Sequence, residues 1–140
     1  MDVQAIRDGL QARLATIAGL RPFDVVPGEV PVPAAIVVPE DPFIDYLQAM
    51  QGGAVVLNFR ITLLAGRATD RTAQDLLDQY LSAGTDAEKS VFNALRGDKT
   101  LGGAASDCIP FEAGDYGTTD VNGTSYYKAD VRVRVHATRS

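Results

Sequence analysis

The C-terminal part of the chain has its most regular pattern, an alternation of apolar and polar residues over residues 125–137. Successive side chains of a β-strand point to opposite faces, so this pattern predicts a strand with one core face and one polar face. Asn122-Gly123 favours a type I′ turn, which predicts that residues 111–121 pair with this strand as a hairpin. The apolar positions are Tyr127, Ala129, Val131, Val133 and Val135, and the polar positions are Lys128, Asp130, Arg132, Arg134 and His136.

Residues 54–65 show the same alternation and predict a second long strand. Before it, six prolines lie between residues 22 and 42, and each removes a backbone donor that a central strand needs. Only short or edge strands are therefore expected there, at 23–26 and 34–38. Pro110 likewise predicts an edge strand or a bulge at 108–111. In the strand at 54–65 we expect Val55, Leu57, Phe59, Ile61 and Leu63 on the buried face, with Asn58, Arg60 and Thr62 on the other.

Three segments have the apolar spacing of helices. The first covers residues 3–20, with Asp2 placed as its N-cap. The second covers residues 73–81. The third is expected at 85–97, because Thr85-Asp86-Ala87-Glu88 matches the capping box. Its expected buried side consists of Val91, Phe92 and Leu95.

These elements predict an α+β fold: a single mixed or antiparallel β-sheet packed against helices, in the order α-β-β-β-α-α-β-β. A length of 140 residues suits one domain, residues 1–140, with a proper core. The hydrophobic fraction of 46% and the charged fraction of 22% are ordinary for a globular protein. Because no secretory signal and no apolar stretch of about 18 residues occurs, we expect a cytosolic chain with no membrane partner.

Charge is unevenly placed along the chain. The net charge is −5, from 13 Lys+Arg against 18 Asp+Glu, which argues against a protein that grips nucleic acid. Residues 126–140 carry +3, so the rest of the chain carries −8. Such polarity suits docking against copies of the chain or against a partner, although a solvated strand face gives the same pattern.

Candidate chemistry is sparse. The chain has a single cysteine, Cys108, so it cannot form an internal disulfide. With a single histidine, His136, it also lacks the ligands for a structural zinc site of Cys and His side chains. The two together are the one candidate for nucleophilic catalysis, if their strands are neighbours. A buried free cysteine more often behaves as a small hydrophobe. We therefore expect no enzyme, no cofactor and no metal.

Residues 39–53 form a long connection that mixes acidic and apolar side chains. Its three acids, Glu40, Asp41 and Asp45, have no base among them. This composition suits a docking loop or arm with Gly52-Gly53 as its hinge, and the alternative is a segment packed on its own domain. The expected interface residues are Phe43, Tyr46 and Leu47 of this segment, together with Arg60, Arg132 and Arg134.

Several short motifs resemble the tail terminator proteins of long-tailed, siphovirus-like bacteriophages. They are Leu101-Gly102-Gly103, Ser106-Asp107-Cys108, Asp115-Tyr116-Gly117, and Gly123 followed by Tyr126-Tyr127, Ala129, Val131 and Val133. The order of elements is also similar, so the resemblance spans nearly the whole chain.

The resemblance implies a structural virion protein without enzymatic activity. It would form a six-membered ring that caps the tail tube, ends tube polymerisation and provides a surface for head–tail joining. The implied partners are further copies of the chain, the tail tube protein and a neck or head-completion protein, with DNA only passing through the lumen. The implied location is the neck end of the virion tail, after assembly in the host cytoplasm.

Three alternatives remain. The first is another head–tail connector, such as a head-completion or stopper protein. The second is a small Cys-dependent hydrolase that uses Cys108 and His136, and the third is a ligand-binding α+β module.

Overall fold

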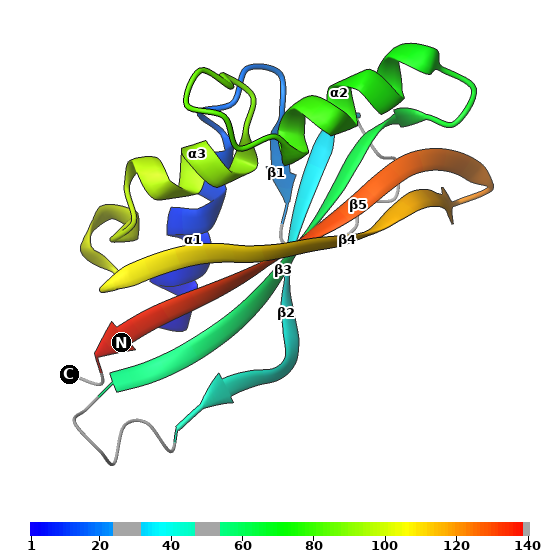
Figure 1. The fold of residues 1–140 in the computed structure, drawn as a ribbon. Helices are drawn as coiled ribbons and strands as arrows, with labels where there is room; N and C mark the ends of the chain where they lie inside the picture. The colour runs from blue at the N-terminus through cyan, green and yellow to red at the C-terminus, as the bar shows by residue number, and fades with distance from the viewer. Residues whose placement is uncertain (24–31, 47–53, 139–140) are drawn as a thin grey trace.

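The residues that the structure describes form one five-stranded sheet with three helices packed on one face (Figure 1). This computed structural model describes residues 1–23, 32–46 and 54–138. The α+β class and the order α-β-β-β-α-α-β-β are as predicted. The elements are α1 (Val3–Leu14), β1 (Arg21–Phe23), β2 (Ala34–Asp45), β3 (Ala54–Arg67), α2 (Arg71–Leu81), α3 (Val91–Gly97), a 3-10 turn at Leu101–Gly103, β4 (Asp107–Val121) and β5 (Thr124–Thr138).

The strand order in the sheet is β1-β2-β3-β5-β4. β1 runs parallel to β2 and the other neighbours are antiparallel, so the sheet is mixed. The predicted hairpin is confirmed: β4 and β5 pair, and Asn122 and Gly123 both have positive φ, 51° and 83°. β1 pairs only with Ala34–Ile36. Beyond Ile36, β2 is therefore an edge strand of the described sheet, as β4 is on the opposite side.

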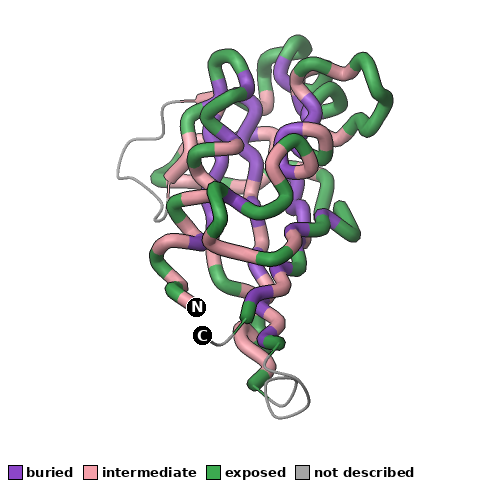
Figure 2. Tube along the Cα trace, turned by 90° about the vertical axis from the view of Figure 1, so that its left-hand side faces the viewer, coloured by how far each residue is buried: buried purple, intermediate pink, exposed green. Residues whose placement is uncertain are grey.

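The core lies between the sheet and the helices. The alternating residues of β3 and β5 are buried as predicted, except that Tyr127 is only half-buried. In Figure 2 the buried stretches, in purple, run mainly through the middle of the fold, and the exposed stretches, in green, lie mainly at its periphery. The helix side contributes Ile6, Leu10 and Leu14 of α1, Leu77 and Tyr80 of α2, and Val91 and Leu95 of α3.

β2 is longer than the sequence predicted. Residues 39–45, expected as the start of a docking loop, continue the strand to Asp45, with a register shift between Pro39 and Ile44. Prolines are tolerated here because an edge strand with a bulge leaves donors unused. The Asn58 side chain donates to the Pro42 carbonyl at 3.1 Å and ties the bulge to β3. Residues 47–53, including Leu47 and the expected Gly52-Gly53 hinge, lie outside the described residues, as do residues 24–26 of the first expected strand.

Two helices begin or end at other positions than predicted. α1 has the expected Asp2 cap but ends at Leu14, and Ile17 and Leu20 are buried from the turns that follow. The capping box at Thr85 is wrong: α3 begins at Val91, and its N-cap is Ser90, which accepts from the Asn93 backbone.

The reason for the later start of α3 is a side-chain bond that the sequence pattern does not reveal. The Asn93 amide donates to the carbonyl oxygens of Gly84 at 2.7 Å and Ala87 at 3.3 Å, which holds the preceding residues as turns. The expectation that Phe92 is buried is also wrong: Phe92 is exposed, and Val91, Ala94 and Leu95 form the buried side of α3.

Candidate interaction surface

The face of the sheet opposite the helices carries most of the predicted interface charges. We call it the open face; its polar side chains on β3 and β5 are Asn58, Arg60, Thr62, Lys128, Asp130, Arg132, Arg134 and His136. The same face also carries a small buried apolar cluster of Ala34, Ile36, Leu64 and Tyr126. No helix within the described ranges packs on it. The two long strands hold these side chains in fixed rows, so the charges have defined positions.

Arg60 and Arg132 lie directly opposite each other on β3 and β5. Like charges at such a cross-strand pair are destabilising unless they are compensated. Arg132 is compensated by two carboxylates of β4, because its guanidinium contacts Glu112 Oε1 at 2.6 Å and Asp115 Oδ2 at 3.4 Å. Arg60 approaches Glu40 Oε2 at 3.9 Å. The two arginines therefore already have partners within their own chain.

Arg134 is bound differently. Its guanidinium carbon lies 4.9 Å from the centre of the Phe111 ring, a cation–π contact. Phe111 is 46% exposed, and Arg134 is exposed as well. Among the described residues no carboxylate forms an ion pair with Arg134. Of the three predicted interface arginines, Arg134 has the most unsatisfied charge.

Asp130 is the one buried residue among the polar side chains of the open face named above, with only 3% of its surface exposed. It accepts from Thr62 Oγ1 at 2.8 Å and from Lys128 Nζ at 3.3 Å. A buried carboxylate needs such partners to offset its lost hydration. Lys128 is thus held to its own strand, and this part of the open face is a structural polar cluster.

The predicted aromatic contacts differ from one another. Phe43 is half-buried and packs edge-on against the core residue Phe59, with ring centres 5.0 Å apart and an interplanar angle of 82°. Phe43 therefore belongs to the core and not to an exposed arm. Tyr46, at the end of β2, is 63% exposed, more than any other large hydrophobic residue described. Tyr46 remains a candidate for contact with a partner.

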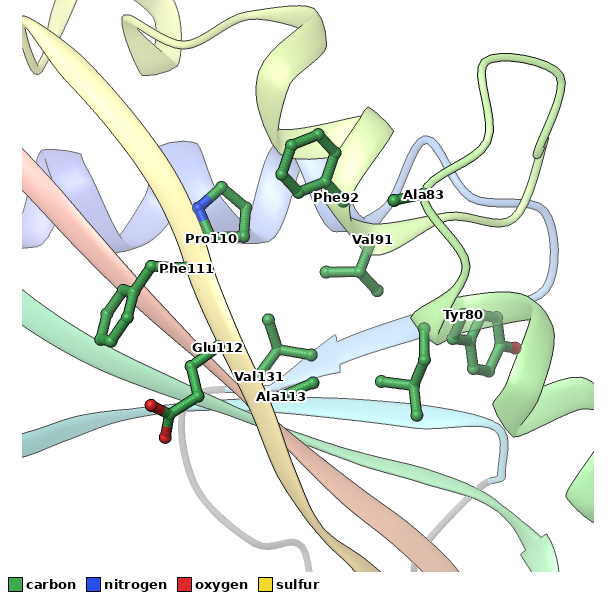
Figure 3. Close-up of a pocket in the computed structure, with 10 residues that line it drawn as sticks. Tyr80, Ala83, Val91, Phe92, Pro110, Phe111, Glu112, Ala113 and Val131 are labelled. Carbon is green, nitrogen blue, oxygen red and sulfur yellow. The ribbon is translucent and has the colours of Figure 1, made fainter.

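A groove of about 230 Å³ lies beside β4, and sequence patterns did not predict it. The end of α2, the start of α3 and the edge strand β4 surround it (Figure 3). Two exposed aromatic residues, Phe92 of α3 and Phe111 of β4, are among its lining residues. Pro110 was the only signal for an irregular edge here. We call this the β4 groove; its lining includes Tyr80, Val91, Phe92, Pro110, Ala113 and Val131.

The structure does not bring Cys108 and His136 together. Cys108 pairs with Val135 and is fully buried on the helix side, whereas His136 is the next residue of β5 and faces the open side. Burial raises the pKa of the Cys108 thiol to about 12, so little nucleophilic thiolate is present near neutral pH. The described residues also contain no group of three or more His, Cys, Asp or Glu side chains that could hold a metal ion.

We expect the buried thiol to make stability fall in alkali. The unfolded thiol ionises above about pH 8.5, while the folded thiol keeps its proton until about 12. The thiol therefore leaves the free energy of unfolding unchanged below about pH 8.5. Above that pH it lowers the free energy of unfolding by about 1.4 kcal/mol per pH unit. Urea unfolding at pH 8, 9 and 10 measures this slope. Cys108→Ala should flatten the slope, and an equal slope in both proteins would contradict the assignment.

No helix in the described part of the chain has both the length and the apolar character required to cross a membrane. In comparisons with known proteins, no family model and no curated protein matches the sequence.

Proposed function

We propose that this chain is a structural virion protein, a tail-terminator-like subunit that forms a ring at the end of a phage tail tube. The ring, hexameric by the family resemblance, would stop tube polymerisation and offer its other side to the neck proteins. Its partners would be further copies of the chain, the tail tube protein and a head-completion protein, and DNA would only pass through the lumen.

The observation that supports this proposal most directly is the open face. On two long paired strands, Arg132 is held by two carboxylates, Arg134 lies over an aromatic ring, and Arg60 approaches Glu40 at 3.9 Å. A surface on which charged side chains already have partners suits contact with another protein, because less side-chain entropy is lost on docking. The net charge of −5 is also compatible with a ring through which DNA passes without adhering.

A different head–tail connector, such as a stopper or head-completion protein, is the second candidate. It would share the size, the acidity and the open face. The two candidates differ in what they bind: a terminator binds the end of the tail tube, whereas the others bind the head side first. The hydrolase alternative is disfavoured by the separation of Cys108 and His136 on opposite faces.

Negative-stain images of purified tail tubes, with and without the protein, test the proposal. We expect a ring at one end of each tube and no further growth when tube protein is added. In phage that lack the chain, we expect tails of uncontrolled length or tails that fail to join heads. Tubes that keep growing in the presence of the protein, or normal tails in its absence, would refute the assignment.

A further inference from the structure

The two edges of the sheet carry different and complementary features. On one edge, the end of β2 presents the exposed ring of Tyr46 and the exposed carboxylate of Asp41. From Glu40 to Tyr46 this edge has three acids and no base. On the other edge lie the β4 groove, on the helix side of the sheet, and Arg134 over Phe111, on the open face.

The two features lie at different positions along the strands. Asp45 of β2 pairs with Val56, Val56 with His136, and His136 with Asp107 of β4, which defines one row across the sheet. Tyr46 follows this row on the β2 edge, whereas the groove residues Pro110 and Ala113 of β4 pair with Val133 and Val131 in the middle of β5. The two features thus lie at opposite edges of the sheet and are offset along the strands.

The β4 edge is poorly suited to accept another strand. Pro110 lacks a backbone donor, and register shifts occur between Pro110 and Glu112 and again between Gly114 and Gly117. Such interruptions are typical devices that prevent strand addition at a sheet edge. The β4 groove is therefore a place for side chains, and its volume of about 230 Å³ is sufficient for one aromatic ring.

We infer that the occupant of the β4 groove is Tyr46 of a second copy of this chain, with Asp41 of that copy paired with Arg134. This inference rests on the proposed ring. The acidic β2 edge complements the arginine that has no carboxylate partner in the described part of its own chain. Because Tyr46 and the groove are different surfaces, the contact is head-to-tail, and contacts of this kind close into a ring when the rotation allows.

Two variants that each disable one half of the contact provide the test. Tyr46→Ser removes the inserted ring, and Ala113→Trp fills the groove from an exposed position on β4. Tyr116→Ser is the matched control, because Tyr116 is an exposed tyrosine of β4 outside the groove lining. This variant also removes the hydrogen bond that the Tyr116 hydroxyl donates to Asp78 at 2.7 Å, so its stability is compared with that of the unmodified chain first. Thermal unfolding shows that each variant is folded, and native mass spectrometry over a concentration series gives the oligomeric state.

We expect rings from the unmodified chain and from Tyr116→Ser, and monomers from each of the two disabling variants. An equal mixture of the two disabling variants should form heterodimers but no rings, since each such pair has one intact contact. Rings from Tyr46→Ser, or a mixture that stays monomeric, would overturn the inference. An unmodified chain that caps tubes but never associates with itself would overturn this contact and leave the proposed function standing.

A charge exchange tests the ionic part independently. Arg134→Glu or Asp41→Arg alone should weaken self-association about tenfold, equivalent to about 1.4 kcal/mol. The double variant Arg134→Glu/Asp41→Arg should recover the original association, because it restores opposite charges. Arg71→Glu, which changes an exposed arginine at the start of α2, is the control for net charge. Equal association of the unmodified chain, the two single variants and the double variant would show that Asp41 and Arg134 do not meet.

Discussion

Replacing Val133 with aspartate is expected to leave the chain unfolded. Val133 has no exposed surface, and its neighbours across the sheet are Phe59 on β3 and Pro110 on β4. A carboxylate at this place has no partner, which costs several kcal/mol, and the lost apolar burial adds about 1.5–3 kcal/mol. Total stabilities of domains are about 5–15 kcal/mol. Circular dichroism and a one-dimensional NMR spectrum measure the loss of fold.

Two control variants distinguish the effect of the added charge from the effect of the lost side-chain volume and of the buried position. Thr138→Asp places the same side chain at an exposed site of the same strand and should unfold like the unmodified chain. Val133→Ala removes volume without adding charge and should fold with reduced stability. A cooperative and unchanged unfolding transition for Val133→Asp would show that this face of β5 is not core.

The sequence predicted the long strands well because their pattern is local. Each of β3 and β5 has one face against the helices and one open face, so the alternation along the chain is regular. Asn122-Gly123 specified the hairpin for the same reason, since the positive φ angles of the turn are a property of those two residues. The α+β class followed from these elements together with the helical spacing of α1 and α2.

The errors lie where a distant residue decides the local structure. α3 begins at Val91 and not at Thr85 because Asn93 reaches back to the carbonyls of Gly84 and Ala87. β2 continues past Pro39 because its outer side is an edge and because Asn58 of the next strand holds the bulge. Neither contact has a signature in the residues 85–88 or 39–45 themselves.

The candidate surface was predicted in part. Alternation placed Arg60, Arg132 and Arg134 on the polar face, but it did not reveal that β4 supplies Glu112 to Arg132 and Phe111 to Arg134. Those partners depend on the register of the β4–β5 pair and on its bulge after Pro110. The β4 groove depends in addition on where α2 ends and α3 begins, so three separate segments determine it.

The segment from Phe43 to Tyr46 shows how the structure divides one predicted docking element into a core part and a surface part. Phe59→Ala is expected to cost about 3–5 kcal/mol, because it empties a fully buried site. Phe43→Ala should cost less, since Phe43 is half-buried, and its effect should couple to that of Phe59 by about 0.5–1.5 kcal/mol through their edge-on contact. Tyr46→Ala should change the free energy of unfolding by less than about 0.5 kcal/mol. Urea unfolding of the three single variants and of the Phe43/Phe59 double variant measures these values. Equal losses from Phe43→Ala and Tyr46→Ala would mean that both residues belong to one exposed arm, whereas a loss confined to Phe43 and Phe59 leaves Tyr46 available for a partner.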